Sequence, residues 1–271
     1  MLLAPGSLRS AEIELAPGAT PCVFGGGLRE VPVEFRNRSD QTLSRKLSYR
    51  LLQISSGSLM PLGAVSDWKS LAIGPGQGVT DVVRLELPSV RVPTRFQLAW
   101  TEGGRRLGTL ALQVVPEQLL GSLNGPAEEP ALGLIDPSGC FTNALRGVRL
   151  ELLAEAESIA AFPGRLILVA PVSAGDRVAG LAKALKRRAA AGTGVVWVQP
   201  ARAAASDVVP SAYVIEEGEG RLVIAEEELV RDLAGSASAQ LHLLRLTDLA
   251  TGRRKLQVPE ESSSELLTRQ E

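Results

Sequence analysis

The chain carries few residues that can act in catalysis, and His242 is the only histidine among its 271 residues. A serine becomes a nucleophile when a histidine base accepts its proton and an acid orients that histidine. Pro171-Val172-Ser173-Ala174-Gly175 is one residue short of a G-x-S-x-G nucleophile turn, and Asp207 and His242 follow in the required order. The sequence therefore offers one catalytic hypothesis, a hydrolase using Ser173, Asp207 and His242. The alternative is that Ser173 caps the following helix, because a proline replaces the first glycine of the motif.

The single histidine excludes His-rich zinc sites, and the two cysteines, expected in different domains, cannot make a Cys-based metal cage. Cys140 lies at the start of a predicted helix, whose dipole would lower the pKa of its thiol, although a small half-buried residue is the alternative. His242 lies among leucines, as many structural histidines do. We therefore expect no metal and no cofactor.

Five candidate ligand-binding residues come directly after predicted strands. Open α/β sheets bind small ligands at the carboxyl ends of their strands, where helix N-termini expose backbone N–H groups. The residues at this edge are Asp136, Ser138, Ser173, Gly175 and Gln199. They include no strong base, so we expect this edge to bind a ligand rather than transform it. The alternative for Asp136 is a strand-to-helix turn with a cap.

Residues 1–120 have the pattern of a β-sandwich. Alternating apolar and polar residues predict half-buried strands, separated by turn residues every 8 to 15 positions. Gly103-Gly104 lies between two strands and predicts a tight hairpin. The strands are expected at 30–37, 43–54, 79–87, 94–101 and 106–115. This number and spacing of strands predict an immunoglobulin-like all-β sandwich.

Residues 121–130 are rich in glycine, proline and acids and predict a linker, whereas residues 131–250 alternate strands with helices. Runs such as 165–170 are almost wholly apolar, as strands covered on both faces must be. Helices are expected at 138–146, 155–161, 178–189, 226–233 and 239–249, and residues 213–215 and 221–225 are expected as edge strands. The pattern predicts a mostly parallel α/β sheet, flavodoxin-like in class, and a polar tail at 251–271.

Gly133-Leu134-Ile135-Asp136-Pro137-Ser138-Gly139, the strand 166–170 and Ala191-Gly192-Thr193-Gly194 give the second part a resemblance to a known family. It resembles degenerate class I glutamine amidotransferase-like domains, as found beside β-sandwiches in β-galactosidase-like bacterial proteins. Working members of that family have a cysteine on the turn after the central strand and a downstream His-x-Glu pair. Here the turn contains Ser173, and Leu243-Leu244 follow His242. The resemblance implies the fold and argues against glutaminase chemistry.

The charge balance excludes a typical nucleic-acid binder, since 29 basic and 30 acidic residues leave a net charge of -1. No run of about 18 apolar residues predicts a membrane span. Residues 1–5 do not form a signal peptide, so we expect a cytoplasmic protein, or a periplasmic, secreted or envelope-associated one if a leader precedes this sequence.

We expect a non-catalytic binding or structural module, accessory to a larger bacterial cell-envelope or polysaccharide-processing protein. Its partner would be a small ligand at the strand edge, or a protein covering Trp68 or Trp100 beside the second domain.

Overall fold

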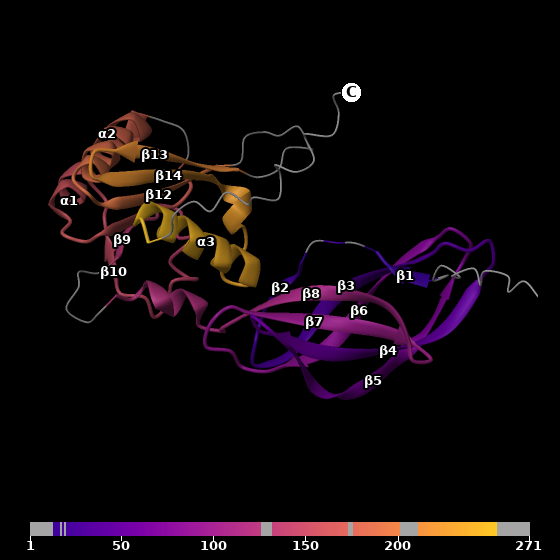
Figure 1. Cartoon of the computed structure of the whole chain (residues 1–271). Coiled ribbons are helices and arrows are strands. Elements are labelled where there is room, and N and C mark those ends of the chain that lie inside the picture. The colour runs from indigo at the N-terminus through magenta and orange to yellow at the C-terminus, as the bar shows by residue number, and fades with distance from the viewer. Residues whose placement is uncertain are drawn as a thin grey trace, which may run out of the picture. The chain divides into compact units, whose positions relative to one another are not determined.

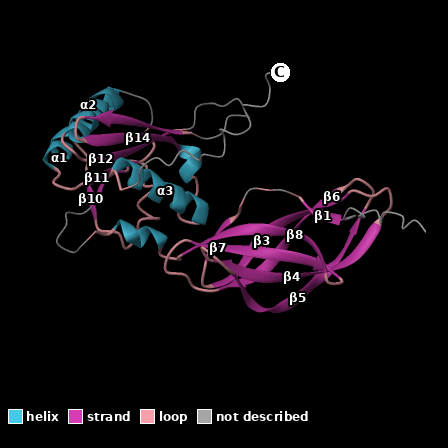
Figure 2. Ribbon diagram, in the orientation of Figure 1, coloured by secondary structure: helices cyan, strands magenta, loops and turns pink. Residues whose placement is uncertain are grey.

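The computed structural model describes residues 13–16, 18, 20–125, 132–172, 176–200 and 211–253. The chain divides into two compact units, residues 1–117 and 118–271 (Figure 1). The first unit is built from strands, and the helices that the structure describes all belong to the second (Figure 2). The predicted change from a β-rich first part to a mixed second part is confirmed.

The first unit contains two sheets. A three-stranded antiparallel sheet has the order β1-β3-β6, and a five-stranded sheet has the order β2-β8-β7-β4-β5. Only the short β2 runs parallel to its neighbour, β8. The strands are β1 (Ile13–Leu15), β2 (Cys22–Phe24), β3 (Gly27–Asn37), β4 (Leu43–Ile54), β5 (Leu59–Ile73), β6 (Gly78–Leu87), β7 (Thr94–Glu102) and β8 (Arg105–Val115).

Alternation along these strands produces the core between the sheets. Every second residue of β3 from Val31 is buried, and β6 contributes every second residue from Val83. These side chains pack against inward residues of the other sheet, including Leu98, so the unit is a β-sandwich. The β7–β8 hairpin turns through Gly103 and Gly104, both with positive φ (53° and 85°), which confirms the predicted tight turn.

Trp100 lies inside this core and is wholly buried. Its ring meets those of Phe35 and Trp68 with 5.0 Å between centroids in each pair. Trp100 therefore stabilises the sandwich, and the expectation that a protein partner could cover it is wrong, because a side chain without exposed surface cannot be covered.

The second unit is built on a six-stranded sheet with the order β10-β9-β11-β12-β14-β13. All neighbouring strands are parallel except the β13–β14 hairpin. The strands are β9 (Leu132–Ile135), β10 (Leu150–Leu152), β11 (Leu166–Val169), β12 (Gly194–Gln199), β13 (Ala212–Glu217) and β14 (Gly220–Glu226). The helices are α1 (Ala156–Ala161), α2 (Asp176–Ala190) and α3 (Ala237–Ala250), with short 3₁₀ helices η1 (Leu119–Leu123) and η2 (Glu227–Val230).

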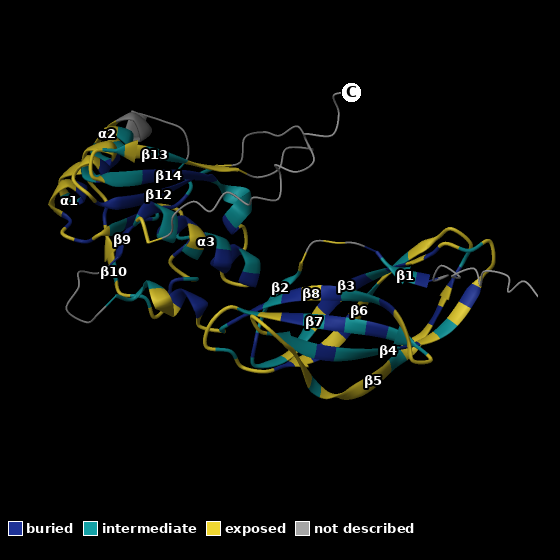
Figure 3. Ribbon diagram, viewed as in Figure 1, coloured by how far each residue is buried: buried dark blue, intermediate teal, exposed yellow. Residues whose placement is uncertain are grey.

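Helical elements cover both faces of this sheet, so its central strands are buried on both sides (Figure 3). Along β12, Val195 and Trp197 pack on the face that carries α2, whereas Val196 and Val198 pack on the face that carries α3. This two-sided burial explains the nearly continuous apolar runs of the sequence.

Three expectations for the second unit need correction. Residues 138–146 form consecutive turns rather than a helix, since Gly139 has a φ of 73°. The helix expected at 226–233 shortens to η2, and Asp232 just after it has a φ of 54°. β14 pairs with both β12 and β13, so only β13 lies at this edge of the sheet.

The segment expected as a linker begins inside the second unit. Leu120, in η1, is buried in the core on the α3 face of the sheet. The Asn124 side chain donates to the Gly147 carbonyl (2.9 Å) and accepts from the Arg149 backbone N–H (2.7 Å). Residues 119–125 thus belong to the fold, because they bury apolar surface and make specific hydrogen bonds. Residues 126–130 lie outside the described part.

Candidate functional site

The carboxyl ends of β9 and β11 form the place where the strand order of the second unit reverses. The chain passes from β9 to β10 on one side and then to β11 on the other. Ligands of open α/β sheets bind at such a reversal. Asp136 follows β9 directly, so it occupies this position as the sequence predicted.

The structure brings two of the five predicted binding residues together. The Ser138 hydroxyl donates to Asp136 Oδ1 at 3.2 Å. Gln199 is half-buried at the end of β12, and β11 lies between its strand and β9. Ser173 and Gly175 lie outside the described residues, as does Asp207.

The Asp136 carboxylate holds the loop that follows it. Oδ1 accepts from the Cys140 backbone N–H (3.0 Å), and Oδ2 accepts from the backbone N–H groups of Phe141 and Thr142 (2.9 Å each). The Thr142 hydroxyl also donates to Oδ2 at 2.9 Å. Six donors from a single turn, counting the Ser138 hydroxyl and the Cys140 thiol (3.6 Å from Oδ1), therefore converge on one carboxyl group, which fits the structural alternative for Asp136.

These hydrogen bonds change the acidity of Asp136. Partial burial acts to raise the pKa of the carboxyl, but the bonds from Thr142, Phe141 and Ser138 outweigh it and hold the pKa below its usual value. The group is therefore an anion stabilised by its own loop, which makes it a poor general acid or base near neutral pH.

Cys140 lacks the activated thiol that its place in the sequence suggested. Its pKa is raised, first by desolvation and further by the neighbouring carboxylates of Asp136 and Glu227. The expected helix, whose dipole would have lowered this pKa, is replaced by turns. The raised pKa favours the alternative of an unreactive small residue, because the thiolate is the nucleophilic form, but the side chain is exposed rather than half-buried.

His242 lies on α3, and its ring faces the backbone. Its Nδ1 is 3.1 Å from the Leu229 carbonyl oxygen. A carbonyl oxygen can only accept, so Nδ1 carries the hydrogen. In a catalytic triad this same Nδ1–H donates to the orienting acid.

Sequence reasoning missed Thr142, which contributes two of the six donors to Asp136. The available signal was a threonine six residues after the aspartate that follows the strand. It was not recognised, because residues 138–146 were expected to form a helix. Among the described residues there is no group of three or more His, Cys, Asp or Glu side chains placed to hold a metal ion. No helix in this part of the chain is long and apolar enough to cross a membrane.

Comparison with known proteins gives little information about this chain. No family model matches the chain, and no curated protein matches it. A β-glucosidase from Listeria innocua in complex with glucose is 17% identical with a TM-score of 0.29, over 38% of this chain and 16% of that one. An alkylpurine DNA glycosylase of Pseudomonas fluorescens, AlkC, is 14% identical with a TM-score of 0.29, over 39% and 31%.

A GH3 β-glucosidase of Bifidobacterium adolescentis is 9% identical with a TM-score of 0.27, over 38% of this chain and 17% of that one. This chain therefore spans less than a third of the length of each of these three structures. Likenesses at this level carry no information about activity.

Proposed function

We propose that this chain is a non-catalytic interaction module: an immunoglobulin-like sandwich followed by a degenerate amidotransferase-like α/β unit. It would serve a larger bacterial cell-envelope or polysaccharide-processing protein and act by binding a protein partner. The strand order of the second unit supports the second half of this description. Numbering the parallel strands along the chain, β9, β10, β11, β12 and β14, gives the order 2-1-3-4-5 of flavodoxin-like sheets.

The observation that carries the proposal is the state of Asp136. It is the chemistry-bearing residue at the reversal of the strand order, and both its oxygens accept hydrogen bonds from its own loop. A ligand or substrate competing for these oxygens would have to displace backbone N–H groups, which would be left without a partner. The residue therefore supports a structural role at the place where a catalytic group would be expected.

The geometry of His242 weighs against the alternative hydrolase. Its Nδ1–H is directed to the Leu229 carbonyl, which occupies the position that Asp207 would need to take as the orienting acid. A carbonyl dipole stabilises the imidazolium of a catalytic step less than a carboxylate does, so Leu229 would be a poor substitute for the orienting acid.

The test is an activity screen of the full chain against ester, glycoside and glutamine substrates, beside Ser173→Ala and His242→Ala. Ser44→Ala, at an exposed position of β4, is the matched control. We expect all four proteins to give the same background rate. Turnover by the unmodified chain and Ser44→Ala that both other variants lose would overturn the proposal and establish the hydrolase.

A further inference from the structure

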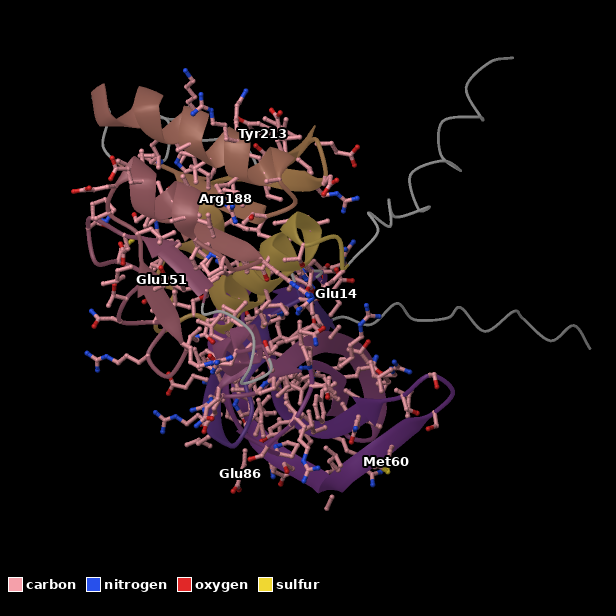
Figure 4. The ribbon with its side chains drawn as sticks, turned by 90° about the vertical axis from the view of Figure 1, so that its left-hand side faces the viewer. Glu14, Met60, Glu86, Glu151, Arg188 and Tyr213 are labelled. Atoms are coloured by element: carbon pink, nitrogen blue, oxygen red, sulfur yellow. The ribbon has the colours of Figure 1, made fainter. Side chains whose placement is uncertain are left out.

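Among the side chains of α2 that the structure describes, four are cationic, and their contacts give them distinct roles. The Lys186 ammonium pairs with Glu217 on β13 at 3.6 Å. Arg188, labelled in Figure 4, turns inward, where one guanidinium nitrogen donates to the Phe162 carbonyl (2.6 Å) and the Thr193 hydroxyl (2.8 Å). Lys183 and Arg187 are exposed and have no ion-pair partner within the described residues.

The two unpaired cations border a groove between α1 and α2 with a volume of about 430 Å³. Small residues line it from both helices and from the turn after α2: Ala156, Ala160, Gly180, Ala184 and Ala191. The remaining lining residues are Lys183, Arg187 and Arg188, so none of the described residues that line the groove is acidic. The groove therefore combines a shallow apolar floor with a positive wall.

We propose that this groove binds an acidic amphipathic helix of a partner protein. The inference rests on the proposed function as an interaction module and assigns the partner's chemistry and its site. Lys183 and Arg187 are four residues apart, about 6 Å between Cβ atoms. They match two carboxylates spaced i, i+4 on a facing helix. Such charge pairs attract the partner helix and also fix its register along the groove.

The dimensions fit a helix. From Gly180 to Ala191 the groove follows eleven residues of chain, about 16 Å at 1.5 Å per residue, or about three turns of a partner helix. A floor of alanine and glycine lets helix axes approach to about 8 Å. An extended peptide binds by adding a strand to an open sheet edge, and this groove is bordered by helices rather than by a strand.

A small anion fits the groove less well. The Arg188 guanidinium offers an anion no open pair of donors, because its Nη2 donates to Phe162 and Thr193 and its Nε is buried, without a hydrogen-bond partner among the described residues. Lys183 and Arg187 remain, at an open apolar surface that a compact, strongly hydrated anion would not cover. The apolar floor and the positive wall together favour an amphipathic partner.

The experiment measures binding of the full chain to a fluorescein-labelled, alanine-based helical peptide with glutamates at i, i+4 spacing, by fluorescence anisotropy at low salt. The comparison peptide carries lysines in place of the glutamates. We expect the glutamate peptide to bind at least ten-fold more tightly than the lysine peptide. Equal binding of the two peptides, or no binding of either, would overturn the proposal.

Two variants locate the site. The double variant Lys183→Glu/Arg187→Glu should weaken binding at least ten-fold. Its control, Arg146→Glu/Arg245→Glu, makes the same charge change at exposed positions outside the groove and should stay within about two-fold. Ala160→Leu fills the groove without changing charge and should also weaken binding about ten-fold.

The same peptides and variants would reveal other occupants of the groove. Equal loss in the two double variants would show attraction to net charge alone, and full competition by inorganic phosphate at constant ionic strength would show a small-anion site. Self-association that Lys183→Glu/Arg187→Glu abolishes would identify a second copy as the occupant. Each of these results overturns the acidic-helix proposal. None of them touches the non-catalytic assignment, which only turnover dependent on Ser173 removes.

Discussion

Asp136 provides the sharpest test of how the second unit is built. Asp136→Ala removes the acceptor for three backbone N–H groups, those of Cys140, Phe141 and Thr142, together with two hydroxyls. Asp136→Asn is the matched variant, since it keeps the shape and one oxygen. That oxygen can replace Oδ2, with its three donors, but the amide nitrogen then faces the Cys140 N–H, donor against donor.

The expected magnitude follows from these contacts. Loss of a side-chain acceptor at a helix or turn start typically costs about 1 kcal/mol for each orphaned N–H, with water recovering part of it at a half-exposed site. Three N–H groups therefore give about 3 kcal/mol for Asp136→Ala. Asp136→Asn orphans one N–H and loses the charge, so we expect about 1.5 kcal/mol.

The difference in stability between the native chain and Asp136→Asn should depend on pH, and its direction follows from the pKa of Asp136. The pKa of Asp136 is lower in the folded chain than the unfolded value of about 3.9. A depressed folded pKa contributes stability that is fully present above the unfolded pKa and is lost as the pH falls through the folded pKa. The gap in stability between the native chain and Asp136→Asn should therefore be complete at pH 7 and shrink below about pH 4.

The assay is urea denaturation followed by circular dichroism at 222 nm, since the described helices all belong to the second unit. It is run at pH 7 and pH 3 on the native chain and both variants. Free energies of unfolding within about 0.5 kcal/mol of one another at pH 7 would refute the role of the carboxylate. A gap that stays constant between the two pH values would refute the role of its charge.

Two further outcomes follow from the same unit. Gly133→Ala should cost about 1–3 kcal/mol in urea denaturation, because the new Cβ would lie 2.8 Å from Leu153 Cδ1 and 3.0 Å from the Phe162 ring. Gly180→Ala, on α2 with no atom within 4 Å, should instead stabilise by about 0.5–1 kcal/mol, and equal effects would contradict this packing. Cys140 should react with iodoacetamide at pH 8 more slowly than a free cysteine, and Asp136→Asn should accelerate it because the Asp136 carboxylate raises the pKa of the thiol; an unchanged rate would contradict this.

The sequence predicted strands where burial alternates and missed them where it does not. β4 has the predicted bounds, and β6 begins one residue earlier than expected. β5 was missed although it is 15 residues long, because its first twelve residues are mostly exposed and include Pro61. Its pairing with β4 shifts register twice, which also breaks the period of two.

The position of Asp136 could be predicted, but its role could not. A polar residue after a buried strand marks the carboxyl edge of a parallel sheet, and Asp136 lies there. The convergence of Cys140, Phe141 and Thr142 on its carboxylate depends on a turn that passes through the positive φ of Gly139. Local helix patterning predicted a helix across these residues, and the carboxylate hydrogen bonds favour the turn instead.

The roles of the cations of α2 could not be predicted from the sequence either. In the sequence, Lys183, Lys186, Arg187 and Arg188 are equivalent members of one basic run, which typically lies in solvent. At about 100° per residue, however, Lys186 reaches Glu217 of β13, whereas Arg188 reaches Phe162 beyond α1. Lys183 and Arg187 stay together beside the α1–α2 groove, one turn apart. The Asp136 carboxylate is thus engaged within the fold, while Lys183 and Arg187 have no ion-pair partner among the described residues. An acidic partner would therefore be attracted to the α1–α2 surface rather than to the carboxyl ends of the strands.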